Sequence, residues 1–422
     1  MKLVPSVRST DSAARAVSPT LRHNQDFLLL WAGQSISNVG DWINFVAITV
    51  LVYQLTGSGL SLGVLRATHA APELILGALA GVYVDRWDRK STMIAADLIR
   101  AVLVALMAVS PNVVEIYALS LGVNLASIFF GPAKSATIPN LVAPDTLTRA
   151  NGLSSTSQTL AMAFGSSIGG IAIAAFGLRQ AFYLDAASFL ISATCIAFIR
   201  VPRTTVAGGK HTAFWTQFSG GWDAVRSHPL RRGITVMASL LVLGPGVSTV
   251  LAVVLAESVL NGGAAGYSLI VSAMGAGAVV GAVSVSALGG RLPRPATYRL
   301  GFFLAAVGTA LLGVGRSLPV AAGAFALIGA GQIVANISGT TILQEHTDDR
   351  LRGRVFGIYQ TVVHVCSLLA AALAGGLADS LGAATVIAAV GALEICLSPL
   401  SLVLVREGRA KGGVRRPATP LS

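Results

Sequence analysis

The sequence predicts an all-α protein that spans a membrane twelve times, and three features of the chain lead to that expectation. Of its 422 residues, 54% are hydrophobic and 11% are charged, whereas soluble domains carry about 25% charged residues. The mean hydropathy of +0.72 is too high for a soluble core to bury so much apolar surface. Twelve apolar stretches, each near the roughly 20 residues that a spanning helix needs, follow one another along the chain.

The predicted spans form two sets of six, separated by the longest polar connection. The first six lie near 27–55, 60–84, 91–110, 113–136, 150–176 and 179–200. The second six lie near 232–258, 264–289, 297–316, 319–343, 354–378 and 382–405. We therefore expect a cytoplasmic tail over 1–26, a six-helix bundle over 27–200, a linker over 201–231, a second bundle over 232–405 and a cytoplasmic tail over 406–422.

The linker is predicted to contain an amphipathic helix. Trp215, Phe218, Trp222 and Val225 recur at a spacing of three or four residues, which places them on one helical face. Such a helix is expected to lie on the cytoplasmic leaflet and to bridge the two bundles rather than to bind a ligand.

The distribution of basic residues orients the spans. If the N-terminus is inside, nearly all of the 30 Lys and Arg residues, Lys134 among them, fall in the tails and the inner connections. The outer turns hold only Arg179 and Arg316. By the positive-inside rule, we expect both termini in the cytoplasm. We also expect the protein in a bacterial inner membrane. The net charge of +12 then reflects topology, and no nucleic-acid partner is expected.

The two halves show a weak internal repeat at an offset near 205. APDTLTRANGL (143–153) and TDDRLRGRVFG (347–357) each place an acidic, Leu- and Arg-containing loop before a helix with Gly. Gly177 and Gly382 follow at corresponding outer turns. Two six-helix repeats related by an axis along the membrane normal enclose a central cavity.

The stretch GVYVDRWDRK (81–90), between the second and third spans, resembles the signature G-x-x-x-D-R-x-G-R-R/K of the major facilitator superfamily. Asp88 replaces the usual Gly. GQSISNVGDWINFVAITVLVYQLTGS (33–58), FFGPAKSATIPNLV (129–142) and LRGRVFG (351–357) are similar to the macrolide-efflux and siderophore-exporter branch of its drug:proton antiporters. This resemblance implies the major facilitator fold, two six-helix bundles around a central cavity. The matching residues are Gly81, Asp85, Arg86, Arg89 and Lys90.

In the resembled family, the Asp of this signature meets the N-terminal end of span 11, where free N–H groups favour an anion. Here that end lies near Gly353 and Arg354. The resemblance implies that Asp85, braced by Arg86, locks the halves together on the cytoplasmic side when the cavity faces outward. The second half has Gly290 in place of the acid, so the lock is expected to be asymmetric.

Span 5 resembles the antiporter signature G-x8-G-x3-G-P-x2-G-G of the same superfamily. Small residues allow helices to approach closely. Ser166 stands where the signature has Pro, so the sequence does not predict the kink that this Pro supplies. The residues at the motif positions are Gly152, Ala161, Gly165, Ser166, Gly169 and Gly170.

Polar residues form stripes on three spans at helical spacing. Gln34, Asn38 and Asp41 share one face of span 1, and Arg66, His69 and Glu73 share one face of span 2. An acid in mid-membrane is costly and usually faces a cavity or a partner. Hydrogen bonding between helices, without transport chemistry, is the alternative explanation. Further cavity-lining candidates are Phe45, Asn124, Gln332, Asn336 and Thr340.

The proton-coupling candidates are Asp41, Glu73, Arg66 and His69. Asp41 is the primary candidate because its stripe continues toward the cytoplasm, and Glu73 is second. Arg66 is two turns from Glu73, so helix motion is needed to bring their side chains together. Span 4 lacks the Arg that the superfamily usually carries there. Asp97 and Arg100 form an expected local pair, and Asp185 and Glu394 are expected to be structural.

The predicted function is that of a proton-coupled secondary exporter of bulky, amphipathic small molecules such as antibiotics or siderophores. A lipid or lysolipid flippase or an uncoupled facilitator on the same fold is the alternative, and a membrane sensor or scaffold is a more distant one. No GxxxxGKS/T motif for ATP hydrolysis is present, and no metal-ligand spacing or nucleophile motif predicts an enzyme. We expect no cofactor and no metal, and a monomer whose partners are the bilayer, the substrate and protons.

Overall fold

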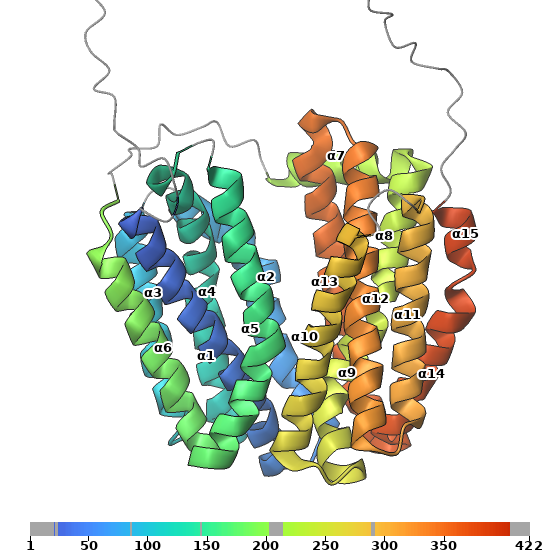
Figure 1. The fold of residues 1–422 in the computed structure, drawn as a ribbon, viewed down its shortest axis with the longest axis horizontal. Coiled ribbons are helices and arrows are strands. Elements are labelled where there is room, and N and C mark those ends of the chain that lie inside the picture. The colour runs from blue at the N-terminus through green and yellow to red at the C-terminus, as the bar shows by residue number, and fades with distance from the viewer. Residues whose placement is uncertain are drawn as a thin grey trace, which may run out of the picture.

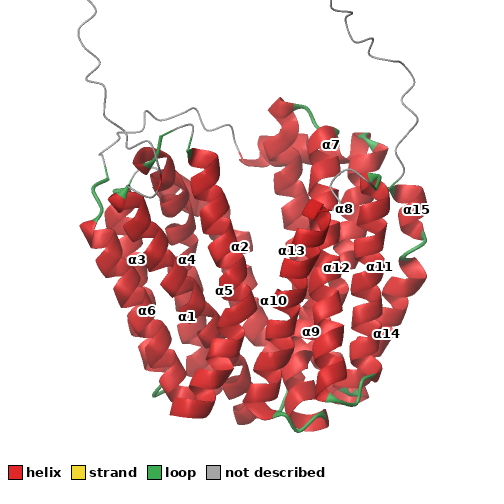
Figure 2. Ribbon diagram, in the orientation of Figure 1, coloured by secondary structure: helices red, strands yellow, loops and turns green. Residues whose placement is uncertain are grey.

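The computed structural model describes residues 21, 24–84, 87–143, 146–201, 214–287 and 292–405. Within these ranges the regular elements are helices, which confirms the predicted all-α fold (Figure 2). The first half comprises α1 (Gln25–Thr56), α2 (Gly59–Val84), α3 (Arg89–Met107), α4 (Val113–Leu141), α5 (Leu147–Phe176) and α6 (Leu178–Phe198). The second comprises α7 (Phe214–Ser227), α8 (Pro229–Leu241), α9 (Leu243–Val254), η2 (Leu255–Val259), α10 (Gly263–Ala287), α11 (Arg294–Val314), α12 (Leu318–Glu345), α13 (Asp349–Leu381), α14 (Ala383–Leu397) and α15 (Leu400–Leu404).

Eight segments of the described chain are long and apolar enough to cross a membrane. The bent helix α5 adds a ninth if its two parts, which meet at 41°, count as one span. The number twelve stays a prediction. The six helices before α7 are consistent with it, as are the six helical segments after it when α8–η2 and α14–α15 each count as one. The eight are α1, α4, α6, α8–η2, α10, α11, α12 and Arg354–Leu381 of α13.

The helices form two groups that touch along two helix pairs (Figure 1). In the first group α1 packs on α5 and α6, and α3 packs on α4 and α6. In the second group α12 packs on α10 and α11, and α11 packs on α14. The groups meet mainly where α5 packs on α10 and where α2 packs on α13. Their ribbons spread apart toward the end where α1 begins (Figure 1).

Helix ends show the local chemistry that the sequence carries. Asn24, Asn112 and Asp88 each accept a hydrogen bond from a backbone N–H in the first turn of α1, α4 and α3, as N-cap residues do. Gly177 and Gly382, at matching turns of the repeat, have φ of 97° and 83°. That backbone region favours glycine, so both turns require it.

The predicted span 7 (232–258) corresponds to one apolar segment, Pro229–Val259, but its helix is not uniform. It is divided at Val242 into α8 and α9 and ends in the π-helical turn η2. The sequence Leu243-Gly-Pro-Gly lies at the division, and Pro245 has no N–H to donate to the helix. The neighbouring N–H of Gly244 donates outside the helix, to Glu394 Oε1 of α14 at 2.8 Å. A side chain therefore satisfies the backbone group next to the break.

The linker helix α7 packs on α13 and α8, so it belongs to the second group of helices. Ala224 and Val225 are buried there, and Gly221 lies against the backbone of Arg354. Trp222 is exposed. The side chains of Trp215 and Phe218 lie outside the described residues, so the predicted apolar face is described only in part.

Candidate functional site

A polar cavity of about 220 Å³ lies between α1, α4 and α5 in the first half. Two residues of the predicted span 1 stripe, Gln34 and Asn38, line it. Most of its other lining residues are serine, asparagine or glutamine, and Lys134 is the one charged residue among them. The other lining residues are Phe27, Leu30, Trp31, Ser35, Ser135, Ile138, Asn151, Ser154, Ser155, Ser157 and Gln158.

Asp41 continues this stripe one helical turn further along α1. Its side chain is exposed although it lies in the middle of a 32-residue helix. The charged groups that act on it include Arg100, Asp97 and Lys134. An acid at this depth in a membrane-spanning helix is costly and marks a candidate functional residue.

Lys134 is a residue that sequence reasoning misplaced. It was expected among the orienting charges of the cytoplasmic connection, whereas α4 continues past it to Leu141. Lys134 lines the cavity and acts electrostatically on both Asp41 and Asp97. Span 4 thus lacks the Arg of the superfamily but carries another cation on its inner face. The available signal in the sequence was the position of Lys134 inside the predicted span 113–136.

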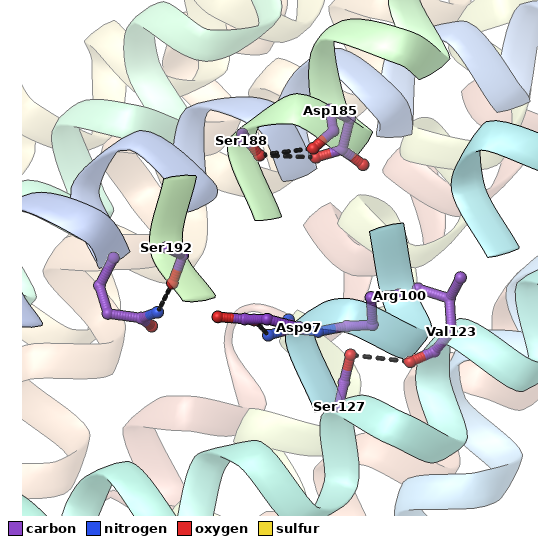
Figure 3. A network of polar contacts seen from close by, with 8 residues as sticks. Asp97, Arg100, Val123, Ser127, Asp185, Ser188 and Ser192 are labelled. Carbon is purple, nitrogen blue, oxygen red and sulfur yellow. Dashed lines mark hydrogen bonds and ion pairs between the residues drawn. The ribbon is translucent and has the colours of Figure 1, made fainter. Parts of the chain in front are cut away.

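A buried ion pair supports the site from α3, as Figure 3 shows. Arg100 pairs with Asp97, which confirms the local pair expected from their spacing. The Arg100 guanidinium carbon lies 4.5 Å from the ring centroid of Phe130 and 4.3 Å from that of Phe189. Arg100 is 6% exposed and Asp97 is fully buried. The two rings and the carboxylate together compensate the cation for its lost hydration.

Helix α6 takes part in the same polar region. Ser192 Oγ accepts a hydrogen bond from Gln34 Nε2 at 3.0 Å, and Ser188 Oγ donates to Asp185 (Figure 3). Asp185 is fully buried, and Asp41 acts on it electrostatically. Gly40 of α1 lies directly against Ser188 and Asp185, so any larger residue there would collide with them. The structural role expected for Asp185 stays a prediction.

The span 2 stripe divides between two environments. Arg66 and His69 line a small space between the halves, with Phe45 of α1 and Thr249 of α9. The guanidinium carbon of Arg66 lies 6.0 Å from the Phe45 ring centroid, and His69 Nε2 is 3.3 Å from Ser120 Oγ. Glu73 is exposed and is not among the residues that line this space. Arg66 and His69 therefore line this cavity, whereas Glu73, one turn further along α2, does not.

The cytoplasmic signature is described in part. Asp85 and Arg86 lie outside the described residues, and so do the surroundings of Gly81 in α2 and Gly353 in α13. The gate contact of Asp85 therefore stays a prediction. The guanidinium of Arg354 lies beside Gly220 of α7.

Arg89 and Lys90 of the signature have contacts of their own. Arg89 donates to the carbonyl of Ala136 near the end of α4, at 2.9 Å. Lys90 donates to the carbonyls of Ala197 and Ile199 at the end of α6, at 2.7 and 2.9 Å. Cations at helix C-termini stabilise the free carbonyls, so these two residues tie the start of α3 to its neighbours.

The span 5 motif provides close helix contacts. A Cβ atom at Gly165 would lie 2.7 Å from Trp42 Cβ, and one at Gly169 would lie 3.1 Å from Ile43 Cα, both on α1. Gly170 abuts Ser268 of α10, in the other half. Gly152 faces open space, whereas Ala161 and Ser166 are buried. The helix bends without the Pro, so the bend does not depend on that residue.

The remaining cavity candidates line neither of these two cavities. Asn124 donates to the Ser120 carbonyl and Thr340 to the Asn336 carbonyl, each within its own helix. Asn336 is exposed, and Gln332 is half-buried. In the described part of the chain, no three His, Cys, Asp or Glu residues gather as metal ligands.

Comparisons with known proteins agree with this architecture. The MFS-type transporter YfiS of Bacillus subtilis, itself uncharacterised, is 29% identical over 405 residues, covering 91% of this chain and 94% of that protein. The multidrug efflux pump Tap of Mycobacterium tuberculosis is 26% identical over 401 residues, covering 90% and 93%. Macrolide efflux protein A of Streptococcus pyogenes is 27% identical over 182 residues, covering 42% and 45%.

A solved structure shares the fold, and a family match covers nearly the whole chain. The nucleoside transporter NupG superposes with a TM-score of 0.72 at 14% identity, over 91% of this chain and 100% of that one. At this identity the likeness establishes the fold alone. Residues 15–411 match the family described as transmembrane secretion effector. The chain therefore belongs to the transmembrane secretion effector family of major facilitator transporters, and it is not an enzyme.

Proposed function

We propose that the protein is a proton-coupled secondary exporter of bulky, amphipathic small molecules. The observation that carries the proposal is Asp41, an exposed mid-membrane acid one helical turn beyond the cavity residue Asn38, on which Arg100 and Lys134 act electrostatically. The names of two relatives, a multidrug efflux pump and a macrolide efflux protein, support the direction and the substrate class. The protein works as a monomer in the inner membrane. Its two termini lie in the cytoplasm, an orientation that the distribution of basic residues favours.

The proposed cycle exchanges a proton for substrate in the first half of the molecule. With the halves apart on the cytoplasmic side, substrate enters and hydrogen-bonds to the amides and hydroxyls of the cavity. Asp41 holds a charge when Lys134 and Arg100 compensate it, and it is neutral when protonated. Switching between these two states changes the interaction between α1 and α4, and the halves then rock to expose the cavity to the other side.

The test compares single variants in proteoliposomes with an imposed pH gradient, with a macrolide and ethidium as probes. In Asp41→Asn, uphill export should fall to the level of empty liposomes, while exchange of probe across the membrane without a gradient continues. Glu73→Gln is the matched control, because Glu73 is an exposed acid on a neighbouring helix and does not belong to the α1 stripe that continues into the polar cavity. It should keep most of the uphill export.

The outcome also separates the alternative functions. If both variants concentrate the probes as well as the parent protein, protons are not coupled through these acids, and an uncoupled facilitator is favoured. If neither probe is transported, a fluorescent lysophospholipid in the same liposomes tests the flippase alternative. Accelerated movement of that lipid between leaflets would replace the exporter proposal.

A further inference from the structure

The two halves are joined at the closed end of the bundle by a carboxylate of one half on a helix N-terminus of the other. Asp379 lies in the last turns of α13, and α2 begins at Gly59. Asp379 Oδ1 accepts from the N–H of Gly59 at 2.7 Å. Its Oδ2 accepts from Ser58 Oγ at 2.7 Å and from the N–H of Leu60 at 3.3 Å. These four residues are called the Asp379 clamp below.

The clamp supplies to α2 what its own half does not. The first N–H groups of a helix have no partner inside the helix, and an anion is favoured beside them. In most proteins a residue just before the helix provides this cap. Here Ser58 precedes α2, but its hydroxyl donates to Asp379 rather than accepting from the helix. When the halves separate, α2 therefore loses its cap and Asp379 loses three donors.

The surrounding packing closes the same end. Gly59 and Gly375 cross so closely that a Cβ on Gly59 would lie 2.9 Å from the Gly375 carbonyl oxygen. Nearby, Tyr53 Oη and Ser258 Oγ form a further hydrogen bond between the halves, at 2.6 Å. Gly170 packs on Ser268 at the other contact. Glycine contacts alone allow α2 and α13 to slide past each other. Three donors that converge on one carboxylate fix a single alignment of the two helices.

We propose that Asp379 is the outer lock of the transporter, and that it stabilises the state in which the cavity faces the cytoplasm. The inference rests on the proposed function and its orientation, which place this end of the bundle outside. The helices α2 and α13 are antiparallel neighbours, and each has an acid at its C-terminal end, Asp85 directly after α2 and Asp379 in α13. The proposed Asp85 gate acts at the opposite end, on the N-terminus of α13. Each lock then holds when the other is released.

The experiment measures how often the closed end opens. Ser268 is buried at the contact with Gly170, so a Ser268→Cys variant is labelled by a membrane-impermeant maleimide only when that end opens. Cys195, Cys366 and Cys396 are free thiols and are replaced by Ser in the background. Labelling from outside, in right-side-out vesicles, needs no substrate and no transport. A failure of the lock is therefore distinguishable from a failure of the proposed function.

Asp379→Ala should increase the labelling rate about tenfold, as expected for loss of one well-placed charge at a helix end. Asp379→Asn should give a smaller increase, because its amide oxygen still accepts one hydrogen bond, and it tests the lock if the Ala variant fails to insert. Asp85→Asn should decrease the rate, since it releases the opposite lock.

The matched control is Glu115→Ala. Glu115 is an acid at the same end of the bundle, and its hydrogen bonds go to Ser110 and Asn112 within the first half. Its loss should leave the labelling rate unchanged. Equal rates in Asp379→Ala and the parent protein would overturn the proposal, as would an equal increase in Glu115→Ala.

Discussion

The two halves of the molecule bury their carboxyl groups in different ways. In the first half, Asp97 pairs with Arg100, and Arg100 also acts electrostatically on the buried Asp185. In the second half, Glu394 is 1% exposed and its Oε1 accepts from the N–H of Gly244. Within the described residues, the groups that act on Glu394 are that N–H and the Thr309 hydroxyl, with no Lys or Arg among them.

The difference is clearest because the positions correspond. A Cβ atom on Gly40 would meet Asp185, and one on Gly244 would meet Glu394. In each half, an acid of the sixth span therefore packs on a glycine of the first span of that half. A carboxylate inside a membrane protein needs a cation or several donors to remain charged. The first half provides cations that act on its acids. The second half provides a fixed hydrogen bond at the break in span 7, which suits a rigid partner.

The largest effect is expected when the first half loses its buried cation. Arg100→Gln leaves Asp97 buried without its partner, and the free energy of unfolding should fall by about 3 kcal/mol. The measurement is a titration with sodium dodecyl sulfate in mixed micelles. Arg66→Gln is the matched control, because Arg66 contacts the Phe45 ring without an ion pair in the described structure, and it should cost less than about 1 kcal/mol.

A double variant sharpens this test. Asp97→Asn with Arg100→Gln leaves no unpaired charge, so most of the lost stability should return. If the double variant is as unstable as Arg100→Gln alone, Arg100 stabilises the first half by packing between the Phe130 and Phe189 rings rather than by its charge. The two halves would then differ in side-chain packing rather than in how they compensate buried charge.

The sequence predicted helices well because span length and apolar content are local properties. The expected spans lie within a few residues of α1, α2, α6, α10 and α12. The break in span 7 was missed, although Leu243-Gly-Pro-Gly was a usable signal, because the partner that stabilises it is Glu394, 150 residues away. A local pattern marks where a helix is weak and does not show which distant side chain compensates it.

The residues of the site that share one face of α1 were predictable from sequence, but the contacts between residues of different helices were not. Helical spacing placed Gln34, Asn38 and Asp41 together, and the structure finds the first two on one cavity. The same reasoning did not connect Lys134 to Asp41, because their approach depends on how α4 packs beside α1. Asp379 was missed for a related reason, since its bond to Gly59 joins residues 320 positions apart.

A smaller, functional effect is expected at Lys134. Lys134→Gln removes a cation near Asp41 without leaving a fully buried charge, so stability should change little. Uphill export should fall about tenfold, which corresponds to roughly 1.4 kcal/mol of lost charge stabilisation during the cycle. Lys134→Arg should restore most of the rate. Arg226→Gln, on the exposed face of α7, is the control and should transport like the parent.

The same assay checks what Lys134 does. If Lys134→Gln transports normally while Asp41→Asn does not, the carboxyl works without a cation from α4, and Arg100 becomes its main partner. If Lys134→Gln is instead strongly destabilised, the lysine holds α4 in place rather than taking part in the exchange of charge.

The smallest effect is expected at Glu394, and it tests the comparison most directly. Glu394→Gln keeps an oxygen that accepts from the N–H of Gly244, so the free energy of unfolding should change by less than about 1 kcal/mol and uphill export should persist. Glu394→Leu removes that acceptor and leaves a buried N–H unpaired at the break in span 7, which should cost about 1–3 kcal/mol. The same micelle titration and proteoliposome assay measure both variants. Loss of uphill export in Glu394→Gln, at unchanged stability, would mean that the second half also carries a coupling proton, and the two halves would then share one chemistry rather than divide it.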